Sequence, residues 1–288
     1  MNSIRIIVVL LSLETAASFL SSRAPTFSCS RSNGRLFDAS TTADAAPSPT
    51  PMEQLNQLKT DLVSTCNKSP KASRDEIRSI VTDLEIVAEQ VGVGQSSSFS
   101  GLLNGEWELL YAPEDETRSS PFFWAFSKAF PDNADQIFGI TDAIPAPVKE
   151  IGPAYQEIDL AESAQSGTFV SRVKVATLGG LATSIMTTRA TILGPDGVDG
   201  IRLKVETTKP EESTIVKTVL GPLADIVNEN APPFPSGEAL ERVSPGSSEV
   251  ILRTTYCDEG LRISRNGERL DDIYIWKRRK FGSYESML

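Results

Sequence analysis

The chain of 288 residues contains no histidine. Histidine is the commonest general base and a frequent metal ligand, so its absence excludes a Ser-His-Asp triad and any histidine-based zinc site. A phosphate-binding glycine loop of the usual spacing and the Gly-x-Ser-x-Gly elbow of hydrolases are also missing. We therefore expect a protein that is not an enzyme and holds no cofactor or metal. A carboxylate pair assembled in space is the catalytic alternative that a sequence leaves open.

Cysteine is scarce, with only Cys29, Cys66 and Cys257 in the chain. Cys29 lies in an N-terminal segment that we expect to be removed. The other two are far apart in the sequence and have no metal-ligand spacing. Two free thiols in a reducing or redox-regulated compartment are the simpler interpretation, and a disulfide between Cys66 and Cys257 is the alternative.

Positive charge is in the minority: the chain has 28 lysines and arginines and 38 acidic residues, which gives a net charge of −10. A nucleic-acid-binding protein normally carries a basic face, so we expect no nucleic-acid partner. The densest basic run is Lys277-Arg278-Arg279-Lys280. We interpret it as a solvated strand end, with contact to an anionic lipid head group as the alternative.

The N-terminus reads as a targeting sequence. Residues 1–18 combine Arg5, the apolar run Ile6–Leu11 and small residues at the exit, which is typical of a signal peptide. Residues 19–50 begin at Phe19, are rich in Ser, Thr and Arg, and end in a proline-rich linker, which is transit-like composition. The combination resembles the bipartite presequence of algal plastids enclosed by extra membranes. Ordinary secretion is the alternative, and it predicts a disulfide-bearing protein.

Residues 51–98 predict a helical hairpin. From Met52 to Cys66 apolar residues recur at intervals of three and four, and a capping box at Ser73-Arg74-Asp75-Glu76 predicts the start of a second helix. Gly92 and Gly94 predict its end. We expect the hairpin to pack across one mouth or side of the next domain, and binding of a protein partner is the alternative.

Residues 99–281 change to a period of two, which predicts a mainly β domain. In its first strand Trp107, Leu109 and Tyr111 are expected on one face, with Glu106 and Glu108 on the other. The segments Gly194–Gly197 and Asn266-Gly267 predict turns. We count about eight to ten strands, enough to close a small antiparallel barrel around one ligand or a packed interior.

One segment of this domain interrupts the β pattern. Ser120 and Pro121 predict a helix start, and Phe122, Phe126 and Phe130 recur at i, i+4 and i+8. Such an aromatic helix needs an apolar partner. We interpret it as a plug at one end of the barrel, and a lid over a lipid cavity or a patch on a lipid surface is the alternative.

Two arginines near the end of the domain are candidates for closing the barrel or binding a ligand. An arginine stacked on Trp107 would close the barrel by cation–π contact. One that projects inward would hold the carboxylate or phosphate of an amphipathic ligand. If Leu261 and Ile263 face the interior, Arg265 shares their side and Arg262 points outward.

Four segments together resemble the plastid lipid-associated proteins, also called fibrillins. They are Leu103-x-Gly105-x-Trp107-x-Leu109-x-Tyr111, Ser120-Pro121-Phe122-Phe123-Trp124, Met186-Thr187-Thr188, and Tyr256-x-Asp258-x-x-Leu261-Arg262-Ile263-Ser264-Arg265. The resemblance implies a lipocalin-like barrel in the plastid (chloroplast), associated with lipid globules (plastoglobules) or thylakoids and with isoprenoid and quinone lipids. Cys257 and Gly260 depart from the expected pattern, which bears on ligand identity more than on fold.

The function that these observations favour is non-catalytic lipid binding, or coating of a lipid surface. The candidate ligand-binding residues are Trp107, Tyr111, Phe122, Phe126, Tyr256, Arg262 and Arg265. The expected partners are a hydrophobic lipid or isoprenoid ligand and a globule or thylakoid surface. The alternative is an accessory or scaffold subunit that binds an enzyme of isoprenoid metabolism through the hairpin or the rim of the barrel.

Overall fold

The computed structural model describes residues 49–94, 101–136, 138, 149–161, 166–177, 182–214 and 232–279. Residues Met1–Thr50 and Pro51–Leu288 form two separate units, and the second is the subject below. The predicted signal peptide and nearly all of the transit-like segment lie outside the described residues.

The N-terminal part of the second unit is the predicted helical hairpin, made of α2 (Pro51–Cys66) and α3 (Arg74–Val91). The Ser73 hydroxyl accepts a hydrogen bond from the Glu76 backbone N–H, so the predicted N-cap is confirmed. Gly92 ends α3 in the left-handed conformation, with φ of 72°, which glycine adopts without steric cost.

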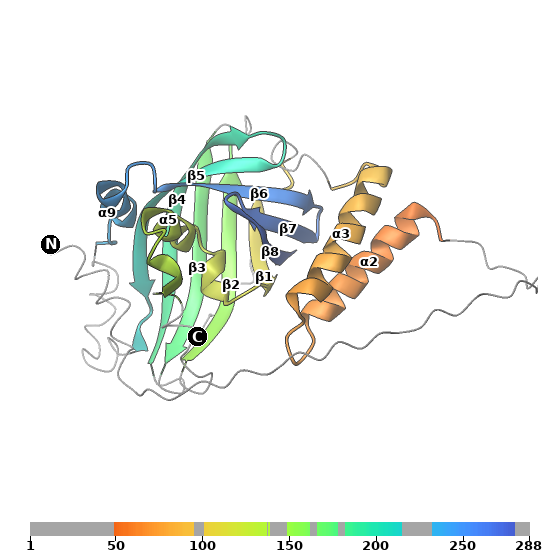
Figure 1. The fold of residues 1–288 in the computed structure, drawn as a ribbon, viewed down its shortest axis with the longest axis horizontal. Helices are drawn as coiled ribbons and strands as arrows, with labels where there is room; N and C mark the ends of the chain where they lie inside the picture. Colours follow the sequence, from red (N-terminus) through yellow and green to blue (C-terminus); the bar gives the residue numbers. More distant parts are fainter. Residues whose placement is uncertain are drawn as a thin grey trace, which may run out of the picture. The chain divides into compact units, whose positions relative to one another are not determined.

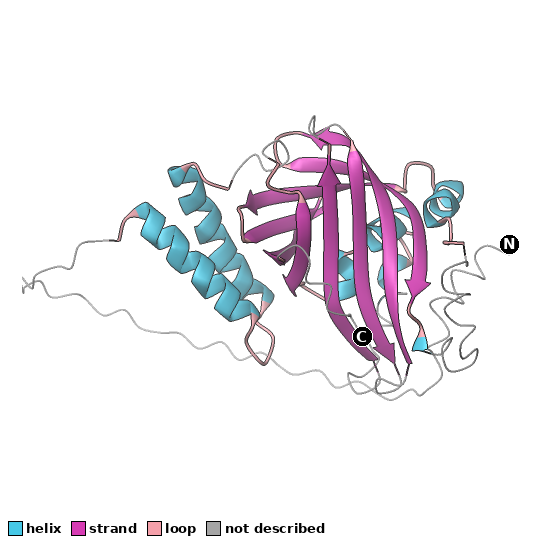
Figure 2. Ribbon diagram, turned by 180° about the vertical axis from the view of Figure 1, so that it is seen from behind, coloured by secondary structure: helices cyan, strands magenta, loops and turns pink. Residues whose placement is uncertain are grey.

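Eight antiparallel strands follow in simple meander order and close on themselves, because β1 pairs with both β2 and β8 (Figures 1 and 2). This confirms the predicted mainly β fold with its preceding helices. The strands are β1 (Gly105–Tyr111), β2 (Lys149–Leu160), β3 (Gly167–Thr177), β4 (Ala182–Asp196), β5 (Gly200–Glu211), β6 (Glu249–Cys257), β7 (Leu261–Asn266) and β8 (Arg269–Arg278).

The first strand differs from its predicted pattern, because a register shift lies between Leu109 and Tyr111. Leu109 pairs with Trp276, whereas Tyr111, two residues later, pairs with Ile275, which is only one residue away on β8. Ile275 and Trp276 are adjacent in the strand, so their side chains point to opposite faces. One extra residue in a strand moves all later side chains to the other face. The prediction that Tyr111 shares a face with Trp107 and Leu109 is therefore wrong.

The turn predicted at Gly194–Gly197 begins two residues later. Gly194 and Pro195 pair with Arg202 and Ile201, so β4 continues through both, and a register shift after Ile192 absorbs the irregularity. The loop between Asp196 and Gly200 is held by two residues of β6. The Arg253 guanidinium donates to Asp196 at 2.8 Å and to Asp199 at 2.7 Å, and the Thr254 backbone N–H donates to the Asp199 carbonyl at 2.6 Å. Contacts from a strand distant in the sequence therefore help to fix this turn.

Short helices of the described residues accompany the barrel, among them η1 (Glu116–Ser119), α5 (Pro121–Ala129) and α9 (Ser236–Val243). Only the first residues of β5, Gly200–Lys204, pair with β6. The start of α9 packs against the next residue of β5, Val205, so closely that a Cβ on Gly237 would lie 1.9 Å from the Val205 carbonyl oxygen. Both ribbon views place α5 within the curve of the long strands (Figures 1 and 2).

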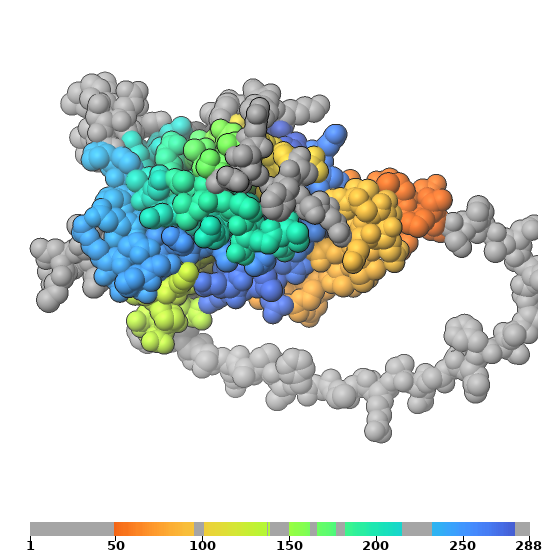
Figure 3. Space-filling view, turned by 90° about the horizontal axis from the view of Figure 1, so that it is seen from above, coloured from red at the N-terminus to blue at the C-terminus, as the bar shows by residue number. Residues whose placement is uncertain are grey.

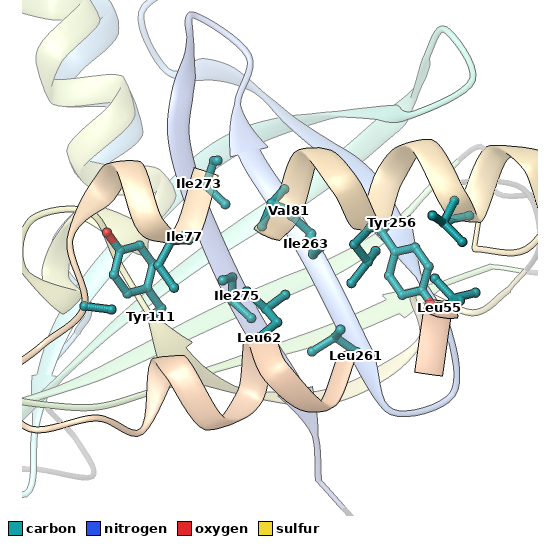
Figure 4. Close-up of a cluster of buried hydrophobic side chains, with 14 residues drawn as sticks. Leu55, Leu62, Ile77, Val81, Tyr111, Tyr256, Leu261, Ile263, Ile273 and Ile275 are labelled. Carbon is teal, nitrogen blue, oxygen red and sulfur yellow. The ribbon is translucent and has the colours of Figure 1, made fainter. Parts of the chain in front are cut away.

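The hairpin packs on the outer side of β6–β8 and β1, and the two share one hydrophobic core (Figure 4). Leu62, Val81 and Leu84 are fully buried there. The space-filling view shows the orange hairpin in direct contact with the blue surface of the last strands (Figure 3). The expected packing against a side of the barrel is thus what the structure shows. The core consists of Leu55, Leu62, Ala72, Ile77, Val81, Leu84, Val87, Ala88, Tyr111, Tyr256, Leu261, Ile263, Ile273 and Ile275.

Candidate functional site

A row of polar side chains crosses the interior of the barrel. Gln156, Ser171, Thr188 and Thr208 are register partners on four successive strands, and Trp107 continues the row on β1. All four polar residues are buried. Since register partners project to the same side of a sheet, the interior face of β2–β5 carries hydrogen-bonding groups at one level.

Hydroxyl groups connect one end of this row to the short helices. Ser120, the N-cap of α5, donates to the Thr188 hydroxyl at 3.3 Å instead of capping its own helix. Thr208 and Ser236 hydroxyls lie 2.9 Å apart, which ties β5 to the start of α9. These contacts hold both helix starts against the barrel.

Arg262 on β7 lies in the interior and is fully buried. Its Nη2 donates to Gln156 Oε1, and its guanidinium carbon lies 5.0 Å from the Trp107 ring and 4.8 Å from the Trp276 ring. Its Nε and Nη1 have no hydrogen-bond partner within the described part of the chain. Burial lowers the pKa of Arg262 to about 9, an effect that nearby Arg278 strengthens and Cys257 opposes, so the group remains a cation at neutral pH.

Arg278 at the end of β8 closes the barrel beneath Trp107. Its guanidinium carbon lies 4.2 Å from the Trp107 ring. The same group donates to the carbonyl oxygens of Leu102, Asn104 and Glu259, at 2.5 Å for Asn104 and 2.8 Å for Glu259. Stacking and hydrogen bonding of this kind join the first strand to the last. The cation–π contact with Trp107 that we expected of Arg262 or Arg265 is made by Arg262. Arg278, within the basic run 277–280, makes a closer one and adds the hydrogen bonds to backbone carbonyls, which the sequence pattern did not predict.

The aromatic helix α5 begins where the sequence predicts, and its aromatic side chains are covered. Phe122, Phe123, Trp124 and Phe126 are all buried. The Trp124 ring lies 5.9 Å from that of Tyr274, whose hydroxyl donates to the Arg118 carbonyl at 2.9 Å. This arrangement is that of the predicted plug. Because these side chains are covered, they form no exposed lipid-contacting patch.

Three of the candidate residues lie outside the barrel, under the hairpin. Tyr111 and Tyr256 belong to the core shared with α2 and α3. The Tyr256 hydroxyl donates to Asp258 at 2.7 Å. Arg265 donates to both carboxylate oxygens of Glu85 on α3, at 2.7 and 2.9 Å.

The orientation of β7 is the reverse of the one considered from the sequence. Leu261 and Ile263 face the hairpin, so Arg262 points inward and Arg265 points outward. Apolar side chains normally mark the interior of a barrel. Here a second apolar layer, the hairpin, covers the outside, and alternation along the strand does not distinguish the two sides.

Each side of the sheet also carries one thiol, which is fully buried for Cys257 and partly buried for Cys66. Cys66 packs against the shared core at the end of α2, and Cys257 lies on the interior face with its thiol toward the Leu102 carbonyl at 3.5 Å. Both are free, which agrees with the simpler prediction. Burial raises the pKa of Cys66 to about 12 and of Cys257 to about 11. Neither thiol is suited to act as a nucleophile.

Of the candidate residues, the interior therefore holds Trp107 and Arg262, with Phe122 and Phe126 on the buried plug helix. Sequence reasoning missed Gln156 and the serine and threonine partners of the row. Their signal was present, since Ser171 and Thr188 occupy inward positions of strands that are otherwise apolar there. Only the register of the strands brings them to one level.

The fold and site define a closed, antiparallel, eight-stranded barrel with an inserted helix and a polar interior. The PAP_fibrillin family profile matches residues 54–271, so the chain belongs to this family of plastid lipid-associated proteins. No curated protein and no solved structure matches the chain. Within the described residues, no helix combines the length and apolar character needed to cross a membrane.

Proposed function

We propose that the protein is a non-catalytic plastid protein that binds a hydrophobic lipid inside its barrel, at lipid globules or thylakoid membranes. Family membership supports the association with plastid lipids. The observation that carries the interior site is the burial of the aromatic residues of α5, together with a barrel interior that holds an incompletely hydrogen-bonded guanidinium. Ligand sites in barrels combine apolar walls with a few polar groups in this way.

The described surface gives less support to lipid coating. Its large exposed hydrophobic residues come from five different segments: Met52, Ile86, Val198, Val243 and Leu270. Single exposed hydrophobic residues are normal for a soluble surface, whereas a lipid-binding surface needs a contiguous patch. The interior is therefore the better candidate site.

The accessory role through the hairpin gains no support from the structure. The apolar faces of α2 and α3 are already covered by the barrel. A partner enzyme would have to use the charged outer face of the hairpin, and no observation favours that contact.

The proposal predicts that the full chain, expressed in a plastid-bearing host and purified by gel filtration, carries lipid detectable by solvent extraction and mass spectrometry. Ala190 lies on the same strand side as Thr188 and is buried, so Ala190→Phe narrows the interior and should reduce the bound lipid several-fold. Leu270→Phe, at an exposed position, is the matched control.

Circular dichroism and a thermal melt establish that the Ala190→Phe variant is folded. Absence of lipid from the unmodified chain contradicts the proposed function. Equal lipid in the folded Ala190→Phe variant and in the control contradicts the interior location.

A further inference from the structure

We propose that Arg262 binds the carboxylate head group of an amphipathic lipid, so that the barrel recognises an acid in preference to a neutral lipid. This inference rests on the proposed function, because it names the part of the ligand that the interior recognises. It also narrows the ligand class, since quinones and isoprenoid alcohols have no such charge.

The position of Arg262 follows from the order of the strands. Arg262 is on β7 and its hydrogen-bond partner Gln156 is on β2, and β8 and β1 lie between these strands in the ring. A side chain can connect β7 to β2 only by passing through the interior. Its guanidinium is therefore inside the barrel, near the indoles of Trp107 and Trp276.

The hydrogen bonds of Arg262 are incomplete. An arginine has five N–H donors, and the one on Nε and the two on Nη1 have no acceptor among the described residues. No described carboxylate forms an ion pair with it, although the group is fully buried. A buried, unpaired cation is costly, and a carboxylate that accepts from one edge of the guanidinium removes most of that cost.

Closure of the barrel does not account for the unsatisfied N–H groups of Arg262. Arg262 contacts the Trp107 and Trp276 rings, but the hydrogen bonds to backbone carbonyls at this point come from Arg278. Arg278 stacks on Trp107 and donates to three backbone carbonyls. Arg265 also has a structural partner, Glu85. Among these three arginines of the last two strands, the fully buried one has the fewest partners.

Ser171 adds a second unsatisfied group close to this site. It is the register partner of Gln156, and its hydroxyl oxygen is buried without a partner in the described residues. Gln156 itself donates to the Ser119 carbonyl at 2.9 Å, which fixes its oxygen toward Arg262. One cation and one hydroxyl suit a monoanion, whereas a phosphate dianion would leave an uncompensated negative charge in the interior.

Binding of a matched pair of lipids tests the inference. The full chain is freed of lipid and titrated with oleate or oleyl alcohol below their aggregation concentrations. The fluorescence of Trp107, Trp124 and Trp276, the three tryptophans of the chain, is the readout, because all three are buried. We expect oleate to bind at least about 10-fold more tightly than the alcohol.

Three variants distinguish the role of the charge. Arg262→Gln should remove the preference for oleate while oleyl alcohol still binds, and Arg262→Lys, which retains a cation, should preserve part of it. Arg265→Gln, on the outer face, should preserve all of it. An unchanged preference in the folded Arg262→Gln variant overturns the inference.

Binding of neither lipid by the unmodified chain contradicts the proposed function as well as the inference. Equal binding of both lipids overturns the inference alone.

Thermal melts of the lipid-free variants add an independent measurement. Removal of an unpaired buried charge should leave the melting temperature of Arg262→Gln unchanged or higher, whereas Arg278→Gln should lower it. A fall in Arg262→Gln as large as in Arg278→Gln would show that Arg262 only supports the structure, and would overturn the proposal.

Discussion

The two faces of β7 and β8 differ in how completely their polar groups are satisfied. On the outer face, Arg265 pairs with Glu85, and apolar residues such as Ile263 fill a continuous core with the hairpin. On the inner face, only one of the three guanidinium nitrogens of Arg262 has a hydrogen-bond partner among the described residues. A surface that serves folding completes its contacts within the chain, whereas a surface that serves binding leaves some for a ligand.

The largest effect should come from removing an apolar contact of the outer face. Leu62 is fully buried between the hairpin and the barrel, so Leu62→Ala should lower the free energy of unfolding by about 2–5 kcal/mol. Ile86→Ala, at a half-exposed position on α3, should change it by less than about 0.5 kcal/mol. Urea unfolding measures both. Similar losses in the two variants would mean that the hairpin is not docked through this core.

The two thiols report on the two faces separately. Their raised pKa values mean that little thiolate exists at about pH 8.5, so iodoacetamide should react roughly 100-fold more slowly with Cys257, and roughly 1,000-fold more slowly with Cys66, than with an ordinary cysteine. Raising the pH should speed both reactions. In Leu62→Ala, Cys66 should become more reactive while Cys257 does not change, as peptide mass spectrometry of the labelled chain will show. Equal acceleration of both thiols would contradict the separation of the two faces.

Closure by Arg278 should have an effect of intermediate size. Arg278→Gln removes a cation–π contact and three hydrogen bonds to carbonyls, and we expect a loss of about 2 kcal/mol in the free energy of unfolding. The neighbouring Lys277 is half-exposed and pairs with Glu108, so Lys277→Gln is a suitable control with little effect. If both variants unfold at the same urea concentration, Arg278 is not the residue that closes the barrel.

The smallest effect should belong to the ion pair on the outer face. Arg265 and Glu85 side chains are 17% and 26% exposed, so solvent screens their attraction in part. Arg265→Gln should lower the free energy of unfolding by about 0.5–1 kcal/mol, and added salt should shrink the difference. Arg242→Gln on α9, whose pair with Glu238 is well exposed, should have no measurable effect. A salt-independent loss would point to packing by the arginine rather than to its charge.

Much of the fold could be predicted from local pattern. Helix starts at Ser73 and Pro121 depend on residues within one turn, and so does the helix end at Gly92. The strand period, the turn at Asn266-Gly267 and the family resemblance are equally local. The site was predicted less well, because its members lie on β2, β3, β7 and α5 and meet only when the ring closes.

The sequence by itself determined the helical hairpin, the aromatic helix, the strand period, the order of hairpin and barrel, and the family of this protein. Only the tertiary structure decided that Leu261 and Ile263 face outward, that Arg262 is inside and that Arg278 closes the ring. The physical reason is that a period of two assigns residues to two faces without saying which face is enclosed. When a helical hairpin buries the outside of a barrel as completely as the barrel buries its interior, only the packing of distant segments distinguishes them.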